Sequence, residues 1–174
     1  MRGTVRYMDQ MIESLLNFSS ISSRELNREE VNLSLIANTI AAQLKIRDPN
    51  RQVEFSIADR IVVEGDKKLL REVIENLLGN AWKYTGKQEK ARIEFGRRNI
   101  NGSATCFIRD NGPGFDMSNA ERLFVPFHRL HSKEEFTGYG IGLSTVQRII
   151  QRHGGKIWAK GEPGRGATFY FTLS

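Results

Sequence analysis

Cysteine and proline are scarce in this chain, which has one cysteine, Cys106, and four prolines among its 174 residues. A single thiol excludes a disulfide framework and any cysteine-based zinc cluster. No apolar run approaches the roughly 18 residues of a membrane span, and no signal peptide opens the sequence. We therefore expect a reducing, cytoplasmic setting, whether or not a longer receptor that carries this chain is attached to a membrane.

Neither sign of charge dominates strongly, because 26 basic residues face 20 acidic ones and the formal net charge is +6. Nucleic acids, nucleotides and acidic protein surfaces all suit a basic chain. The basic runs are short, as at Lys67-Lys68 and Arg97-Arg98, and acidic residues lie among them. Nucleic-acid readers usually cluster their basic residues or interleave them with aromatic ones, so we expect no nucleic-acid partner.

The first 20 residues have the apolar periodicity of a helix. Their apolar side chains recur at steps of three and four residues and form one stripe: Val5, Met8, Ile12 and Leu15, widened by Met11, Leu16 and Phe18. A stripe this wide favours a partner helix, including one from a second copy of the chain. Packing on the chain's own domain is the alternative. The polar stretch from Ser19 to Glu30 predicts a joint.

The rest of the chain contains helical patterns and pairs of adjacent strand patterns, without a βαβ alternation. Ser34 is expected to cap a helix that ends near Ile46, and Asp66 to cap a long helix whose apolar side runs from Leu69 to Ala81. The other predicted elements are a helix over 143–152, strands over 53–57, 61–63, 93–95, 106–108, 157–159 and 167–173, and a hairpin turn at Asn101-Gly102.

Neighbouring strands are expected to form antiparallel pairs. This order of elements predicts an α+β fold with one domain of ordinary size. We expect a two-layer α/β sandwich whose mixed, mostly antiparallel sheet is covered on one face by helices, plus an extended N-terminal helix.

Ten of the 16 glycines lie between Gly112 and Gly166, most of them in three short groups. The groups are Asp110-Asn111-Gly112-Pro113-Gly114, Gly138-Tyr139-Gly140-Ile141-Gly142 and Gly161-Glu162-Pro163-Gly164-Arg165-Gly166. Such loops are either simple turns or present backbone amides to phosphates, above all where a helix begins right after them. A P-loop and a dinucleotide fingerprint are both excluded, because Gly86-Lys87 lacks the required neighbours and the second group has the wrong spacing.

A polar stripe marks the predicted long helix. Glu72, Asn76 and Asn80 are four residues apart, so they lie on one side of the helix, opposite its apolar side. A carboxylate and amide oxygens suit Mg²⁺, which keeps waters and phosphate oxygens as further ligands. Lys83 lies one turn further on, next to Tyr84. The alternative is a solvated helix face, but asparagine inside a helix is unfavourable and asks for a compensating role.

Five motifs in this order resemble the ATP-binding domain of histidine kinases, in the superfamily shared with gyrase, the MutL proteins and the ninety-kilodalton heat-shock chaperone. The first motif resembles the family's asparagine box and reads Glu72-x-x-x-Asn76-x-x-x-Asn80-Ala81-x-Lys83-Tyr84. The first glycine box has its counterpart in Asp110-x-Gly112-x-Gly114, and the phenylalanine box in Phe124-x-x-Phe127. The second and last glycine boxes have theirs in Gly138-x-Gly140-x-Gly142-Leu143 and Gly164-x-Gly166-Ala167-Thr168. The resemblance covers about residues 50–174 and is nearest to phytochrome-like two-component sensor kinases.

The resemblance implies ATP and Mg²⁺ as ligands and assigns residues to them. Asp110 would accept a hydrogen bond from the adenine amino group, and Asn76 would hold Mg²⁺. Arg129 would reach the γ-phosphate, and Glu72 occupies the place where ATP-hydrolysing relatives keep a water-activating base, so these two and Asn76 are the implied catalytic residues. The other implied nucleotide contacts are Asn80, Lys83, Tyr84, Gly112, Gly114, Gly138, Gly140, Gly142, Leu143 and Thr168.

The chain departs from the family in its histidines. In the family the phosphate-accepting histidine stands on the first helix of a dimerising hairpin, whereas His128, His131 and His153 are the only histidines here. We expect residues 1–28 to be the second helix of that hairpin with its linker, and residues 29–174 to be the ATP-binding catalytic domain. The chain would then lack its own acceptor.

The function implied by the resemblance is transfer of the γ-phosphate of Mg-ATP to a histidine on a dimerisation helix. The implied partners are the histidine-bearing dimerisation domain of the same kinase, the receiver domain of a response regulator, and a second copy of the chain through the N-terminal helix. Two alternatives stay open: a serine kinase of the anti-sigma type, and an ATP-sensing module without catalytic activity.

Overall fold

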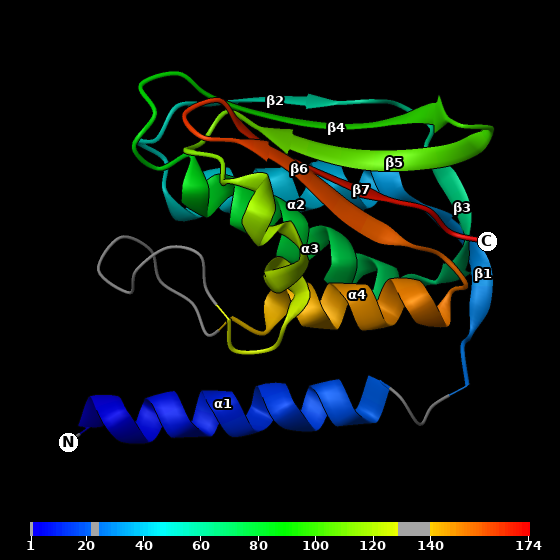
Figure 1. Ribbon diagram of the computed structural model, residues 1–174, viewed down its shortest axis with the longest axis horizontal. Coiled ribbons are helices and arrows are strands. Elements are labelled where there is room, and N and C mark those ends of the chain that lie inside the picture. Colours follow the sequence, from blue (N-terminus) through cyan, green and yellow to red (C-terminus); the bar gives the residue numbers. More distant parts are fainter. Residues whose placement is uncertain (1, 22–24, 129–139) are drawn as a thin grey trace.

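A computed structural model describes residues 2–21, 25–128 and 140–174. Its elements follow in the order α1 (Arg2–Ile21), β1 (Arg28–Asn32), α2 (Leu33–Arg47), β2 (Val53–Ile57), β3 (Val62–Asp66), α3 (Lys67–Tyr84), β4 (Ala91–Ile100), β5 (Ser103–Asp110), the 3₁₀-helix η1 (Met117–Phe124), α4 (Gly142–Arg152), β6 (Ile157–Glu162) and β7 (Gly166–Phe171). Figure 1 shows that β2, β4, β5, β6 and β7 form one layer and that α2, α3 and α4 form a second layer on one face of it.

Five strands form the main sheet in the order β2-β4-β5-β7-β6, and β1 pairs with β3 in a separate two-stranded sheet. The predicted mixed, mostly antiparallel sheet is confirmed, because β2 runs parallel to β4 and the other pairs are antiparallel. The expectation that segments 53–57 and 61–63 pair with each other is wrong. After β3, α3 carries the chain back across the sheet, so β4 returns beside β2 in the parallel direction.

The core lies between the main sheet and the helices. Alternate strand residues such as Ile93, Phe95 and Ile108 are almost fully buried and face the helix layer. The predicted apolar side of α3 is confirmed, since its buried residues are Leu70, Val73, Ile74, Leu77, Leu78 and Ala81. This packing leaves the opposite, polar face of α3 for other uses.

Helix caps follow the sequence only in part. Asp66 caps α3 as predicted, through hydrogen bonds from two backbone N–H groups of the first turn. The predicted cap of α2 is wrong, because Asn32 rather than Ser34 holds that position. Ser34 is buried, and its hydroxyl donates to the Ala58 carbonyl and accepts from the Ile61 N–H, a use that only the folded chain reveals.

Two elements escaped prediction. β1 lies partly inside the expected joint and buries only one residue, Val31, so it has no alternating pattern to find. The other, η1, is a short 3₁₀-helix that is capped by Asp116 and ends at Phe124, the first residue of the predicted phenylalanine box.

The N-terminal helix α1 is confirmed and lies below α4, away from the main sheet (Figure 1). Its last residue, Ile21, is buried, and the Ile21 carbonyl accepts a hydrogen bond from Arg152 of α4. Four residues of the apolar stripe face solvent, with exposed fractions of 57, 52, 43 and 64% at Met8, Ile12, Leu15 and Leu16. These four side chains do not pack on the chain's own domain. Within the described residues, no helix is long and apolar enough to cross a bilayer.

Candidate functional site

The polar face of α3 forms the first wall of the site. Five of its residues are half-buried: Glu72, Asn76, Asn80, Lys83 and Tyr84. The Asn76 Nδ2 atom donates a hydrogen bond to the Glu72 carbonyl at 2.9 Å, which leaves Asn76 Oδ1 to face the start of α4. The predicted stripe therefore presents an amide oxygen toward a neighbouring helix.

The second glycine group meets this stripe at Asn76. Gly142 is the first residue of α4, and a Cβ atom placed there would lie 2.5 Å from Asn76 Oδ1. Any side chain at position 142 would have to displace this oxygen. The N-terminal backbone amides of α4 and the Asn76 oxygen thus lie side by side, a pair of groups suited to phosphate and to a hard cation respectively.

Asp110 supplies a buried carboxylate at the end of β5. Only 6% of its surface is exposed, and its Oδ1 accepts a hydrogen bond from the Gly112 N–H at 2.8 Å. Burial raises the pKa of Asp110 to about 6, against the opposing effect of backbone hydrogen bonds from Gly112 and Ala167. A carboxylate that has lost most of its water gains most from a further hydrogen-bond donor, such as one on a ligand.

Gly112 brings Asp110 against the C-terminal end of α3. A Cβ atom at Gly112 would lie 2.9 Å both from the Tyr84 carbonyl oxygen and from Asp110 Oδ1. Tyr84 lies two helical turns after Asn76, so the two contact points are about 12 Å apart along the helix axis. An extended nucleoside triphosphate spans a comparable length, with its base at one end and its phosphates at the other.

Two further glycines build the floor under Asp110. Gly114 has φ +65°, and a Cβ atom there would lie 2.0 Å from the Glu162 carbonyl oxygen. Gly166 has φ +95°, and its Cβ would lie 2.0 Å from the Asp110 carbonyl oxygen. These glycines let the loop after β5 and the turn between β6 and β7 pack backbone against backbone, which explains Gly114 without any ligand contact.

The Thr168 side chain is not brought to the site. Thr168 stands opposite Arg109 in the β5–β7 pair, and its Oγ1 accepts a hydrogen bond from Arg109 Nε at 3.3 Å. Because side chains alternate along a strand, Thr168 and Arg109 lie on the face of the sheet opposite to Asp110. Ala167 has the position across from Asp110 instead.

Lys83, Leu143 and Gly140 are further residues that the resemblance assigns to the nucleotide. The Lys83 Nζ atom lies 4.4 Å from the centre of the Tyr84 ring, at the end of α3 beside Gly112. Leu143 packs against the hydrophobic core, and Gly140 has φ +72° and accepts a hydrogen bond from the backbone of Phe127. Two expected site residues, Arg129 and Gly138, lie outside the described residues.

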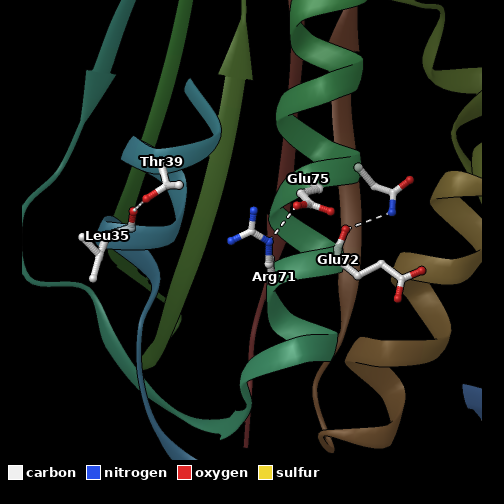
Figure 2. Close-up of polar contacts among 6 residues, drawn as sticks. Leu35, Thr39, Arg71, Glu72 and Glu75 are labelled. Atoms are coloured by element: carbon white, nitrogen blue, oxygen red, sulfur yellow. Dashed lines mark hydrogen bonds and ion pairs between the residues drawn. The ribbon is translucent and has the colours of Figure 1, made fainter. Parts of the chain in front are cut away.

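Glu72 lies in a groove of about 460 Å³ that also includes Lys68, Arg71, Glu75 and Asn76. In Figure 2 the Glu72 carboxylate points away from the ion pair of Arg71 Nε with Glu75 Oε1, which measures 2.8 Å. Burial raises the pKa of Glu72, and the charge of Glu75 raises it further. A raised pKa makes a carboxylate a better proton acceptor, so the environment suits an acid–base role.

Asn111 is a positioning residue that the sequence interpretation missed. Its Oδ1 accepts from the Arg92 N–H and its Nδ2 donates to the Lys90 carbonyl, both at 2.8 Å. These bonds attach the residue after Asp110 to the start of β4. Its place within Asp110-Asn111-Gly112 was the available signal, but its partners are 19 and 21 residues away in the chain.

The fold and this arrangement agree with comparisons with known proteins. Residues 65–174, more than half of the chain, match the family described as "Histidine kinase-, DNA gyrase B-, and HSP90-like ATPase". The chain belongs to this family, and it is an ATP-binding domain of the kind that histidine kinases contain.

Its relatives include proteins that are longer than this chain. Cyanobacterial phytochrome B of Nostoc sp. is 38% identical over 169 residues, which cover 95% of this chain and 22% of the relative. The adaptive-response sensory kinase SasA of Synechococcus sp. is 33% identical over 177 residues, which cover 99% of this chain and 47% of the relative. The chain thus spans between about a fifth and about half of these relatives.

Solved structures show the same fold. Full-length ShkA, in complex with AMPPNP, superimposes with a TM-score of 0.77 at 24% identity, covering 99% of this chain and 36% of that one. The catalytic domain of the histidine kinase ThkA gives a TM-score of 0.68 at 25% identity, covering 84% of this chain and 97% of that one. The expected resemblance to histidine kinase catalytic domains is confirmed.

Proposed function

We propose that this chain is the catalytic part of a two-component sensor kinase that transfers the γ-phosphate of Mg-ATP to a histidine on a dimerisation helix. The observation that carries the proposal is that a buried carboxylate, Asp110 of β5, lies against the C-terminal end of α3, while the Asn76 amide oxygen faces the start of α4 about two turns earlier on the same helix. A cytoplasmic location would supply Mg-ATP and keep the Cys106 thiol reduced.

The base would be chosen by Asp110. Adenine carries an amino group that donates to a carboxylate, whereas guanine carries a carbonyl oxygen at the same ring position, which the carboxylate would repel. Backbone N–H groups of the protein already donate hydrogen bonds to the Asp110 carboxylate. A further hydrogen bond from the adenine amino group would lower the pKa of Asp110 and favour its ionised form. Tyr84 and Lys83 lie at this end of α3 and would contact the base, the ribose or a phosphate.

The phosphates would lie at the other end of the same stretch of α3. Asn76 Oδ1 is a hard oxygen ligand next to the first residue of α4, which fits Mg²⁺ together with phosphate oxygens. When bound, Mg²⁺ neutralises phosphate charge. Gly142 lets the backbone approach both groups, and we propose Asn80 as a neighbour of the metal ligand and Arg129 as the cation at the γ-phosphate.

Transfer to histidine requires little basicity, because neutral imidazole already has a lone pair near pH 7. Positioning and electrostatics would therefore supply most of the rate. Glu72, beside Asn76 and with a raised pKa, would orient the incoming imidazole or take its proton. The acceptor itself would come from the dimerisation domain, and the exposed stripe on α1 would pair with that domain and with a second copy of it.

The decisive experiment supplies the chain with a separate helical hairpin that carries a histidine, together with ATP labelled at its γ-phosphate. Label on the hairpin that is lost in acid and kept in alkali supports the proposal. Acid-stable label on serine of an added protein would indicate a serine kinase, and no transfer despite ATP binding would indicate a sensing module. The Asp110→Ala variant is the control, because it should lose both nucleotide binding and transfer.

A further inference from the structure

A second groove lies outside the proposed nucleotide site, at the end of the main sheet where β2 and β4 begin. It has a volume of about 480 Å³ and is lined by Lys45, Pro49, residues 51–54 and residues 89–92. Val53 and Ala91, the first residues of the two parallel strands, stand side by side within it. We call this the basic groove.

Positive charge accumulates around the basic groove. Its lining holds four basic and two acidic residues: Lys45, Arg51, Lys90 and Arg92 against Glu54 and Glu89. Among the described residues of the lining, only Arg92 and Glu54 form an ion pair, at 3.5 Å. The groove is therefore a cationic surface that its own acids do not neutralise.

Two of the cations are held in place by aromatic rings. Lys45 Nζ lies 5.3 Å from the centre of the Phe55 ring, and the Arg51 guanidinium carbon lies 4.3 Å from the centre of the Trp82 ring. Arg51 also donates a hydrogen bond to Thr85 Oγ1 at 2.8 Å. The two rings stack at 6.0 Å with 13° between their planes. Cations held in this way lose less entropy when they bind an anion.

The strand next to the basic groove has an unused edge. β2 stands first in the five-stranded sheet, and among the described strands it pairs only with β4. In Figure 1 it runs along the outer border of the sheet. The Ala58 N–H bonds to Phe95 of β4, so in a parallel strand the backbone groups of Phe55 and Ile57 point the other way, toward the unused edge.

We propose that the basic groove and the outer edge of β2 bind an extended acidic segment of a partner protein, which adds one strand to the sheet. The groove cations would pair with the carboxylates of the segment, and the strand edge would bond to its backbone. This proposal does not depend on phosphate transfer by the chain.

A peptide fits the groove better than a nucleic acid or a free polyphosphate does. Glu54 and Glu89 lie among the cations and would repel a continuous row of phosphates, whereas a peptide presents separate carboxylates and donor N–H groups between them. A strand edge also offers alternating N–H and C=O groups, which only another polypeptide in extended form matches in register.

Fluorescence anisotropy tests the proposal with a labelled peptide of about seven alternating glutamates and valines, long enough to match β2. We expect binding to the 174-residue chain with a Kd below about 1 mM at low salt, and none with a peptide in which lysine replaces glutamate. The double variant Lys45→Glu, Lys90→Glu should weaken binding by at least about tenfold. Backbone amide signals of Phe55 and Ile57 should shift in NMR spectra on titration of the unmodified chain.

The double variant Lys156→Glu, Lys160→Glu is the matched control, because it makes the same change of charge at two exposed positions at β6, at the far edge of the sheet. An equal loss of affinity in this variant would overturn the proposal, since it would reveal only a general charge effect. Tighter binding of tripolyphosphate or of a single-stranded oligonucleotide to the groove would also overturn it. Retained binding of AMPPNP by the double variant shows that the variant is folded.

Discussion

Replacing Asp110 with asparagine should stabilise the protein near neutral pH while it abolishes ATP binding. In the free protein the Asp110 carboxylate is almost fully buried, and burial raises its pKa from 3.8 to about 6. A shift of about two pKa units corresponds to an unfavourable term of about 3 kcal/mol in the folded state when the group is ionised. Asparagine has nearly the same shape and no charge, so it removes this term.

The expected gain in the free energy of unfolding is smaller than the full gain of about 3 kcal/mol that removal of the buried charge would provide. The asparagine oxygen can still accept from the Gly112 N–H, but its NH₂ group would face the Ala167 N–H, and two opposed donors cost about 1–2 kcal/mol. We therefore expect the free energy of unfolding of Asp110→Asn to exceed that of the wild type by about 1–2 kcal/mol at pH 7.5.

The pH dependence gives the sharper test. A carboxyl group with a raised pKa in the folded state contributes stability that is complete below its ordinary pKa of 3.8 and is lost as the pH rises through about 6. On going from pH 7.5 to pH 5 the wild type should therefore regain about 1.4 kcal/mol relative to Asp110→Asn. Urea unfolding at both pH values, followed by the fluorescence of Trp82 and Trp158, measures this difference, and calorimetric titration measures ATP binding.

Asp116→Asn is the matched control. Asp116 is exposed, and hydrogen bonds from Ser118 lower its pKa, so its stabilising effect is present above pH 3.8 and is lost only below that value. This variant should gain no stability at pH 7.5, and its difference from the wild type should not change between pH 7.5 and pH 5. A gap between wild type and Asp110→Asn that does not narrow at pH 5 would refute the burial argument. Unchanged ATP affinity in Asp110→Asn would refute the adenine assignment.

Three other predictions concern the glycines and the buried histidine. Gly112→Ala should weaken ATP binding and lower stability, because its Cβ would meet the Tyr84 carbonyl at 2.9 Å. The control is Gly79→Ala in α3, whose Cβ would have nothing within 4 Å. This control should stabilise the protein by up to about 1 kcal/mol and leave the ATP affinity measured by calorimetry intact. Gly142→Ala should displace Asn76 Oδ1 and lower ATP affinity about tenfold with Mg²⁺ but less with EDTA, and equal losses would contradict a metal role for Asn76. His153 is buried, its Nδ1 bonds to the Ile149 carbonyl and its Nε2 accepts from the Asp66 N–H, so His153→Phe should lower the free energy of unfolding at pH 7.5 by about 2 kcal/mol. Burial lowers the pKa of His153, so its stabilising effect is present above pH 6.5 and is lost as the pH falls through the lowered pKa. The difference in free energy of unfolding between the wild type and His153→Phe, measured by urea unfolding, should therefore become smaller in acid.

Residues that act through their near neighbours in the chain were predictable. The polar stripe of α3, its Asp66 cap and the hairpin turn at Asn101-Gly102 all follow from spacings within one or two turns. Helical periodicity and capping depend on residues at most four positions apart, so a single sequence contains the whole signal. The glycine groups were found for the same reason.

Residues that act through distant partners were not predictable. Asn111 positions the loop after β5 by bonding to the start of β4, and Gly114 is required by a carbonyl of β6. Whether Ala167 or Thr168 lies across from Asp110 depends on the register of β5 and β7, because a step of one residue moves a side chain to the other face of a sheet. No local pattern specifies that register.

The amino-acid order alone determined which α-helices form, which face of α3 is polar, and which family the glycine and asparagine motifs indicate, because these properties reside in short stretches of chain. Tertiary structure alone decided that β2 pairs with β4, that Asp110 is buried with a raised pKa, and that Asn76 meets Gly142. Each of these depends on contact between segments far apart in the chain, and their energies come from desolvation and packing that exist only once the segments meet.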